Sequence, residues 1–301
     1  MKISAGLLSL LTIASLSTAY AGEMTREYST ASPGETALDL FSLESSYVFQ
    51  SELDNDFGLS SDQDAFHASI EYSHRFRLGG SKIFLRAGLA YNHFQFGETN
   101  APVPEQLFSI AGVVGLEYMV GNDVGAFLYL RPGFYTEEHI GSSSFDIPVT
   151  LGRVFVLQQD RLFFIVGATG AGLRGEFPIL PIAGLIWKPS EQWNVFLVPP
   201  NPRITYSPSK NVGFYAGGEL VGSSFRTDRD SNIFPAKLSN AQVDYTEYRA
   251  GLGVDFRCGD AVSVNIGGGY AFQRRFNFDR AGEDFKADPA PYVRVGLTAN
   301  F

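Results

Sequence analysis

The stretch YVRVGLTANF, residues 292–301, alternates between apolar side chains and polar or small ones. Successive side chains of a β-strand point to opposite faces, so this pattern predicts a strand with one wholly apolar face. An aromatic residue that closes such a strand is typical of bacterial outer-membrane β-barrels, and we expect the barrel-assembly machinery to bind this strand. Its apolar face comprises Val293, Val295, Leu297, Ala299 and Phe301.

The same segregation recurs upstream, at residues 66–75, 83–91, 108–118 and 247–257. In each segment one face carries apolar residues and no charge. A lipid-facing exterior and a polar interior produce this pattern in a transmembrane barrel. A soluble β-sandwich also alternates, because it buries one face of each sheet.

Aromatic residues distinguish these two folds. If successive strands run in opposite directions, the aromatic residues gather at the two ends of the apolar faces, as in the girdles at the two membrane interfaces. A sandwich core gives no reason for this sorting. The sequence therefore predicts an all-β fold, an antiparallel transmembrane β-barrel. The expected girdle residues are Tyr72, Tyr118 and Phe256 at one end and Tyr91, Tyr248 and Tyr270 at the other.

The segments suggest about fourteen strands, an even number as in single-chain bacterial barrels. The weak point lies between residues 179 and 206, where a hairpin could be short, bulged or off the wall because Pro181, Pro199, Pro200 and Pro202 cannot donate ladder hydrogen bonds. Without it the count falls to twelve. The expected strands are residues 43–53, 65–76, 82–94, 106–119, 125–135, 147–157, 162–171, 179–187, 193–198, 203–206, 214–223, 244–257, 261–276 and 291–301.

Short and long connections alternate between these segments, as the periplasmic turns and outer loops of barrels do. The long connections expected from the sequence are residues 54–62, 97–105, 137–145, 227–240 and 277–287. This alternation places the long loops outside the cell.

The first residues predict export. Lys2, an apolar run at residues 3–16 and the small-residue site at 19–21 are typical of a secretory signal peptide. We therefore expect a signal peptide at 1–21, a periplasmic leader at 22–42 and an outer-membrane barrel at 43–301. The single cysteine, Cys258, cannot form an intramolecular disulfide.

Charge and spacing exclude several functions. The chain has a net charge of −9 and no basic stripe that could neutralise phosphates, which argues against nucleic acid as a partner. Two acidic loop groups could hold a divalent cation, but neither spacing fits a defined calcium loop, so we expect solvated acids, no metal and no cofactor. These groups are Asp54, Asp56, Asp62 and Asp64, and Asp228, Asp230 and Asn232.

A catalytic pair is also conceivable at His67 and Ser69, which are two residues apart on one strand. A serine nucleophile needs a positioned base and a third group that orients it. No such third group is identifiable, and both side chains are expected to face the lumen instead of lipid. We therefore predict that the protein is not an enzyme.

Charged residues on the polar faces are the candidate functional residues. They could line a water-filled pore, or interlock as ion pairs that brace the barrel. Glycine-rich interior faces favour a narrow passage, whereas residues 163–166, apolar on both sides, would suit a hydrophobic solute. The candidates are Glu71, Arg75, Arg86, Glu117, Glu219, Glu247, Arg249, Asp255, Arg275 and Arg294.

Three segments carry a family resemblance: residues 181–219, residues 248–276 (YRAGLGVDFRCGDAVSVNIGGGYAFQRRF) and the ending DPAPYVRVGLTANF. They resemble a family of uncharacterised bacterial outer-membrane proteins catalogued as domain of unknown function 6268. The resemblance spans nearly the whole mature chain. It implies an outer-membrane β-barrel and supplies no activity.

The sequence thus predicts a passive pore or transporter for small solutes, in contact with outer-membrane lipids. A structural or surface-display barrel with partner-binding outer loops is the alternative. A lipid-modifying enzyme is a third and weaker hypothesis.

Overall fold

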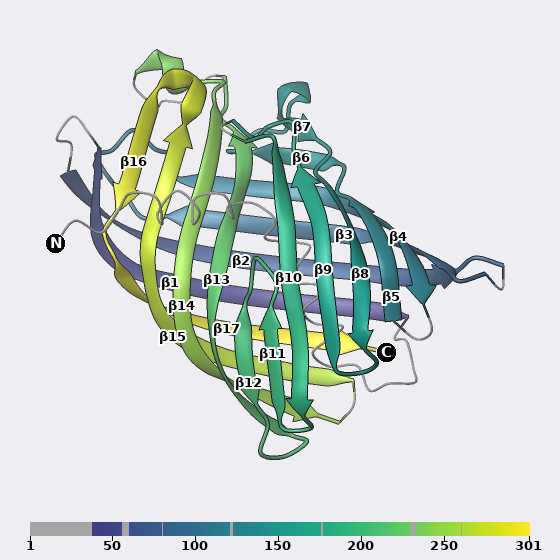
Figure 1. Cartoon of the computed structure of the whole chain (residues 1–301). Helices are drawn as coiled ribbons and strands as arrows, with labels where there is room; N and C mark the ends of the chain where they lie inside the picture. Colours follow the sequence, from purple (N-terminus) through teal and green to yellow (C-terminus); the bar gives the residue numbers. More distant parts are fainter. Residues whose placement is uncertain are drawn as a thin grey trace, which may run out of the picture.

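The computed structural model describes residues 38–55, 60–79, 81–120, 123–175, 177–229, 233, 235–259 and 261–301. Its strands form one sheet that closes on itself (Figure 1), because the first strand, β1 (Asp39–Asn55), pairs antiparallel with the last, β17 (Ala290–Asn300). Closure removes the free sheet edges that hydrocarbon cannot satisfy. The predicted antiparallel β-barrel is confirmed.

The wall has fourteen strands, although seventeen strand elements are defined. Three elements continue their predecessors after a break, and Pro132, Pro148 or Pro289 stands in each break. Proline donates no ladder hydrogen bond, which explains the breaks. The elements are β2 (Ser60–Arg77), β3 (Ile83–Phe96), β4 (Gln106–Val120), β5 (Asp123–Leu130) continued by β6 (Gly133–Thr136), β7 (Phe145–Asp146) continued by β8 (Val149–Gln158), β9 (Leu162–Gly170), β10 (Ile179–Ser190), β11 (Trp193–Leu197), β12 (Arg203–Tyr206), β13 (Val212–Arg226), β14 (Gln242–Cys258), β15 (Val262–Phe278) and β16 (Glu283–Ala287) continued by β17, with short 3₁₀ turns at Ser142–Ser144, Ala236–Leu238 and Asp279–Ala281.

The proline-rich hairpin lies in the wall. β11 pairs with β10, and β12 pairs with β13. The prediction of fourteen strands is therefore confirmed over twelve. The prolines nevertheless stop the hairpin early, so that Ile179–Gly184 of β10 have a ladder partner only in β9 among the described strands.

Both chain ends of the barrel lie at the end with the short turns, where the Asp39 N–H donates to the Phe301 carbonyl (2.7 Å). β1 begins at Asp39 and not at residue 43, because closure pairs its first residues with the end of β17. The expected barrel boundary at residue 43 was thus too late. The expected signal peptide and most of the leader lie outside the described residues.

Two of the long connections expected from the sequence are wrong. β1 and β2 run through most of 54–62, and β15 and β16 through most of 277–287. These extensions pair through their backbones, but their apolar residues, such as Leu53, Phe278 and Phe285, are buried in the interior while charged residues take the other face, so the lipid-facing alternation does not mark them. No helix among the described residues is long and apolar enough to cross a membrane.

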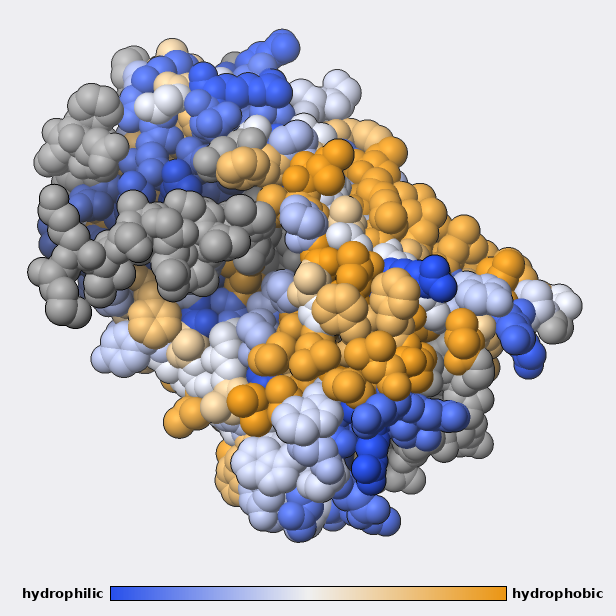
Figure 2. All heavy atoms as spheres, in the orientation of Figure 1, coloured by the Kyte–Doolittle hydropathy of each residue, from blue (hydrophilic) through white to orange (hydrophobic). Residues whose placement is uncertain are grey.

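Large apolar side chains cover the outside of the wall. Figure 2 shows them over the middle of one face, with hydrophilic residues at both ends. Leu89 and Leu252 are each 67% exposed, which is costly in water and favourable in hydrocarbon. Of the expected girdle residues, Tyr248 is half-buried, and the exposed ones are Tyr72, Tyr91, Tyr118, Phe256 and Tyr270.

Candidate functional site in the barrel interior

The polar faces of the strands meet inside the barrel, and most of the candidate charges lie there. Asp255 and Arg294 are partly buried. Asp255 forms an ion pair with Arg203 (3.6 Å), and Arg294 forms one with Glu219 (2.8 Å). The buried candidates are Glu71, Arg75, Arg86, Glu117, Glu219, Glu247 and Arg249.

One group of these residues, the Glu117 cluster, lies inside β2 to β5. Glu117 on β4 accepts hydrogen bonds from Arg86 Nε (3.0 Å), from Tyr129 Oη (2.7 Å) and from Arg75. Arg86 Nη1 also donates to Ser73 Oγ (3.0 Å). Every one of these side chains is at most 3% exposed. The cluster cross-links four adjacent strands, so it braces this part of the wall.

A second group, the Glu247 cluster, joins β14 to β1. Glu247 accepts from Arg249 Nε (2.7 Å) and from Tyr245 Oη. Arg249 Nη1 donates to Ser46 Oγ on β1 (2.9 Å), although β15 and β17 separate these strands along the wall. The cluster therefore spans part of the interior instead of following the wall.

Three further ionic side chains contribute that the sequence analysis did not single out. Arg294 also pairs with Glu44 (3.4 Å), and Glu71 pairs with Arg131 (2.6 Å). Strict alternation along β1 and β5 would have placed Glu44 and Arg131 on the interior face. The third, Arg274, could not have been found in this way.

Arg274 and Arg275 exchange their expected places. Arg249 pairs with Ala271 and Tyr248 pairs with Gln273, so Phe272 is an extra residue in β15. Such a bulge shifts the alternation by one residue. Arg274 consequently lies in the interior (1% exposed), whereas Arg275 pairs with Asp284 on the other face of the sheet (2.6 Å). The expectation that Arg275 lines the lumen was wrong.

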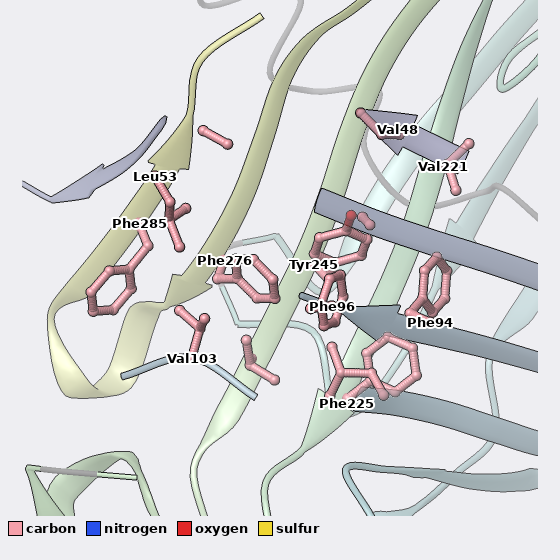
Figure 3. Packing of buried hydrophobic residues seen from close by; sticks show 14 of the residues in the cluster. Val48, Leu53, Phe94, Phe96, Val103, Val221, Phe225, Tyr245, Phe276 and Phe285 are labelled. Atoms are coloured by element: carbon pink, nitrogen blue, oxygen red, sulfur yellow. The ribbon is translucent and has the colours of Figure 1, made fainter. Parts of the chain in front are cut away.

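Aromatic side chains fill the interior near the long loops, and we call Phe94, Phe96, Phe225, Tyr245 and Phe276 the aromatic plug. Figure 3 shows these rings gathered within one cluster of buried residues. The ring of Phe96 on β3 lies 4.8 Å from that of Phe276 on β15, and Phe94 lies 5.1 Å from Tyr245 on β14. Because β17, β1 and β2 intervene between β15 and β3, these contacts cross the barrel.

Two connections fold inward against the plug. Ala101 and Val103, between β3 and β4, and Leu173, between β9 and β10, are buried in the same cluster. These connections thus add apolar side chains to the packing across the interior at this level.

Buried polar groups beside the plug retain hydrogen-bonding capacity. Arg274 Nη2 donates to Ser51 Oγ (2.9 Å), but Arg274 Nε and Nη1 have no partner among the described residues. Neither atom of the Gln63 amide has one either. Leaving such a buried group unsatisfied costs about 1–3 kcal/mol, so these atoms favour water or a polar group of a solute beside them.

The possible catalytic pair does not assemble. The ring of His67 stacks on Phe94, with centroids 4.4 Å apart, and neither of its ring nitrogens forms a hydrogen bond to Ser69. His67 therefore does not serve Ser69 as a positioned base.

No family model matches the chain, so the family resemblance stays a prediction, and no curated protein matches it either. Among solved structures, the Pseudomonas putida toluene transporter TodX is similar at 10% identity, with 96% of this chain and 95% of that chain covered and a TM-score of 0.47. An outer membrane channel from Pseudomonas putida F1 gives 9% identity, coverages of 89% and 97% and a TM-score of 0.48.

The translocator domain of the autotransporter NalP from Neisseria meningitidis is 12% identical, with coverages of 93% and 95% and a TM-score of 0.38. Of these neighbours, two are named as a transporter or a channel and the third as a translocator domain. At such identities and TM-scores none of them carries an argument about this chain. Its barrel fold rests on its own strand pairing.

Proposed function

We propose that this protein is an outer-membrane barrel that passes small solutes, and that its interior favours solutes with both an apolar body and a polar group. The exposed apolar band and the aromatic residues at its ends support contact with outer-membrane lipids. The terminal strand with Val293, Val295, Leu297 and Phe301 is the proposed signal for the barrel-assembly machinery.

A single observation carries the solute class: next to the aromatic plug lie buried polar atoms that have no partner in the described part of the chain. Arg274 and Glu247 are register partners on β15 and β14, and Tyr245 of the plug donates to Glu247. A solute could therefore place its polar group on Arg274 while its apolar part contacts Tyr245 and Phe276. A binding site of this kind combines apolar walls with a few placed polar groups.

Passage requires the plug to open. Its members contact one another across the barrel only through side chains, whereas the backbone of each is held in its own ladder. Side-chain rearrangement is much faster and less costly than breaking a ladder. We therefore expect the rings to swing aside while the wall stays closed.

Solute flux into proteoliposomes tests the proposal. Benzenesulfonate is the probe, because it is permanently anionic, aromatic and unable to cross lipid unaided, and arabinose is the hydrated comparison. We expect benzenesulfonate influx above that of protein-free liposomes, a several-fold reduction in Arg274→Met and no change in Arg275→Met. The two variants remove the same charge on opposite faces of one strand.

Two outcomes would count against the proposal, and they differ. Influx of arabinose without benzenesulfonate would retain the passage and overturn the solute class. Absence of influx for both solutes, together with electrical silence in planar bilayers, would overturn the passage itself.

A second function is favoured by the ion pairs. Glu117 and Glu247 are bound so completely by neighbouring side chains that they brace the barrel instead of lining open space. A sealed barrel that serves as a structural or surface-display scaffold would have this interior. An impermeable protein whose outer loops bind a partner would support that function.

A further inference from the structure

Two long connections meet across the mouth of the barrel. One, residues 137–144, joins β6 to β7, and the other, residues 227–241, joins β13 to β14. The ends of β6 and β13 form a parallel bridge at Thr136 and Arg226, although these strands are not neighbours in the wall. The Glu137 N–H donates to the Arg226 carbonyl (3.1 Å), and the Asp228 N–H donates to Glu137 Oε2 (2.9 Å).

This backbone bridge brings together three side chains that can bind a metal. One ligand atom each of Glu138, His139 and Asp228 lies within 4.8 Å of the others. Asp228 is held in place, because the His139 N–H donates to its Oδ2 (3.1 Å) and Thr136 Oγ1 approaches its Oδ1 (3.4 Å). His139 Nδ1 lies 2.6 Å from Asp228 Oδ2, so the ring already faces the carboxylate.

We propose that Glu138, His139 and Asp228 form a binding site for a divalent transition-metal ion such as Zn²⁺. One imidazole nitrogen and two carboxylate oxygens are a ligand set that Zn²⁺ uses, and three protein ligands leave a fourth position for water. Ca²⁺ and Mg²⁺ prefer more ligands, all of them oxygen. The chemistry of the three groups therefore selects a transition metal.

The present distances need only small adjustments. Zn²⁺ holds its nitrogen and oxygen ligands at about 2.0–2.2 Å, so neighbouring ligand atoms of a tetrahedral site are about 3.4 Å apart. His139 Nδ1 and Asp228 Oδ2 must separate slightly from 2.6 Å, and Glu138 must approach. The side chain of His139 is 79% exposed, so nothing packed around it opposes this movement.

The site would act as a clamp. Its ligands come from connections 89 residues apart in sequence, on opposite sides of the mouth. A bound ion would add metal–ligand bonds to the backbone-mediated contacts that already join these connections, and so would restrict their separation. This role does not depend on the solute that the barrel passes.

Metal titration of the purified full chain, without a histidine tag and after chelator treatment, tests the proposal. In calorimetry with Zn²⁺ alone we expect one equivalent to bind, and at least a tenfold loss of affinity in His139→Ala and in Asp228→Asn. His93→Ala is the matched control, because His93 is a half-buried histidine on β3 that is hydrogen-bonded to Gln106. This variant should bind like the unaltered protein.

Two results would overturn the site. One is the absence of Zn²⁺ binding to the unaltered protein, and the other is equal binding by His139→Ala. The variants alter an exposed loop, so both should fold, and the shift of folded barrel on an unheated denaturing gel checks this. Co²⁺ absorption in the visible range gives a second readout, because its intensity reports a tetrahedral site that includes nitrogen.

Discussion

The Glu117 cluster and Arg274 are both buried and charged, but they differ in how they are partnered. Both carboxylate oxygens of Glu117 are hydrogen-bonded, to Arg86, Tyr129 and Arg75. Arg274 keeps two guanidinium nitrogens without a partner among the described residues. The two regions therefore differ in role. The Glu117 cluster braces the wall at β2 to β5, whereas the side near β14 and β15 keeps hydrogen-bond donors available for water or a solute.

Of the variants considered, Glu117→Ala should lower the stability of the barrel most. It leaves the guanidinium groups of Arg75 and Arg86 buried without their shared counter-charge, and breaking a buried pair in this way costs about 3–5 kcal/mol. Urea unfolding in detergent, followed by tryptophan fluorescence, measures the loss. Glu105→Ala, in an exposed connection, is the control. A loss below about 1 kcal/mol would mean that the cluster does not brace the wall.

Tyr245→Phe should have an intermediate effect. The ring stays in the plug, but Glu247 loses one hydrogen-bond donor, which costs about 1–2 kcal/mol for a buried acceptor. Arg274 is the register partner of Glu247 and has donors to spare, so it could replace the missing bond. If Tyr245→Phe lowers the free energy of unfolding by almost nothing in the same assay, Arg274 has replaced the missing bond. The double variant Tyr245→Phe, Arg274→Met should then be destabilised by the full amount.

Arg274→Met should change stability least, by no more than about 1 kcal/mol. Methionine fills a similar volume, removes buried donors that lack partners, and leaves Glu247 bound to Arg249 and Tyr245. A loss as large as that of Glu117→Ala would remove the distinction between the two regions. It would place Arg274 among the residues that brace the barrel.

Much of the architecture could be predicted from the sequence, because a barrel wall imposes one simple rule. Every lipid-facing position must be apolar, and the strands that obey this rule strictly, such as β3 and β4, were placed to within a few residues. The interior position of the Glu117 cluster could also be predicted, because alternation alone puts Arg75, Arg86 and Glu117 on the interior face.

Prediction from the sequence failed where the lipid-facing alternation is interrupted or ends. The bulge at Phe272 exchanges Arg274 and Arg275, and one extra residue leaves no mark in hydrophobic periodicity. The hairpins that extend beyond the apolar band bury apolar residues such as Leu53 and Phe285 in the interior and carry charged residues such as Asp54 and Asp284 on the other face, so the lipid-facing pattern does not mark their length. The bridge between β6 and β13 depends on how two loops fold over the mouth, which no local pattern encodes.

The short β11–β12 hairpin also sets the shape of the barrel. All fourteen strands run through the short-turn half, but β11 and β12 stop at Leu197 and Arg203, so only twelve continue toward the long loops. Barrel diameter grows roughly in proportion to strand number, and the bridge from β6 to β13 draws the far end in further. Fewer strands therefore enclose the interior at the level of the aromatic plug, which fits the ring contacts that Phe94 and Phe96 make across it with Tyr245 and Phe276.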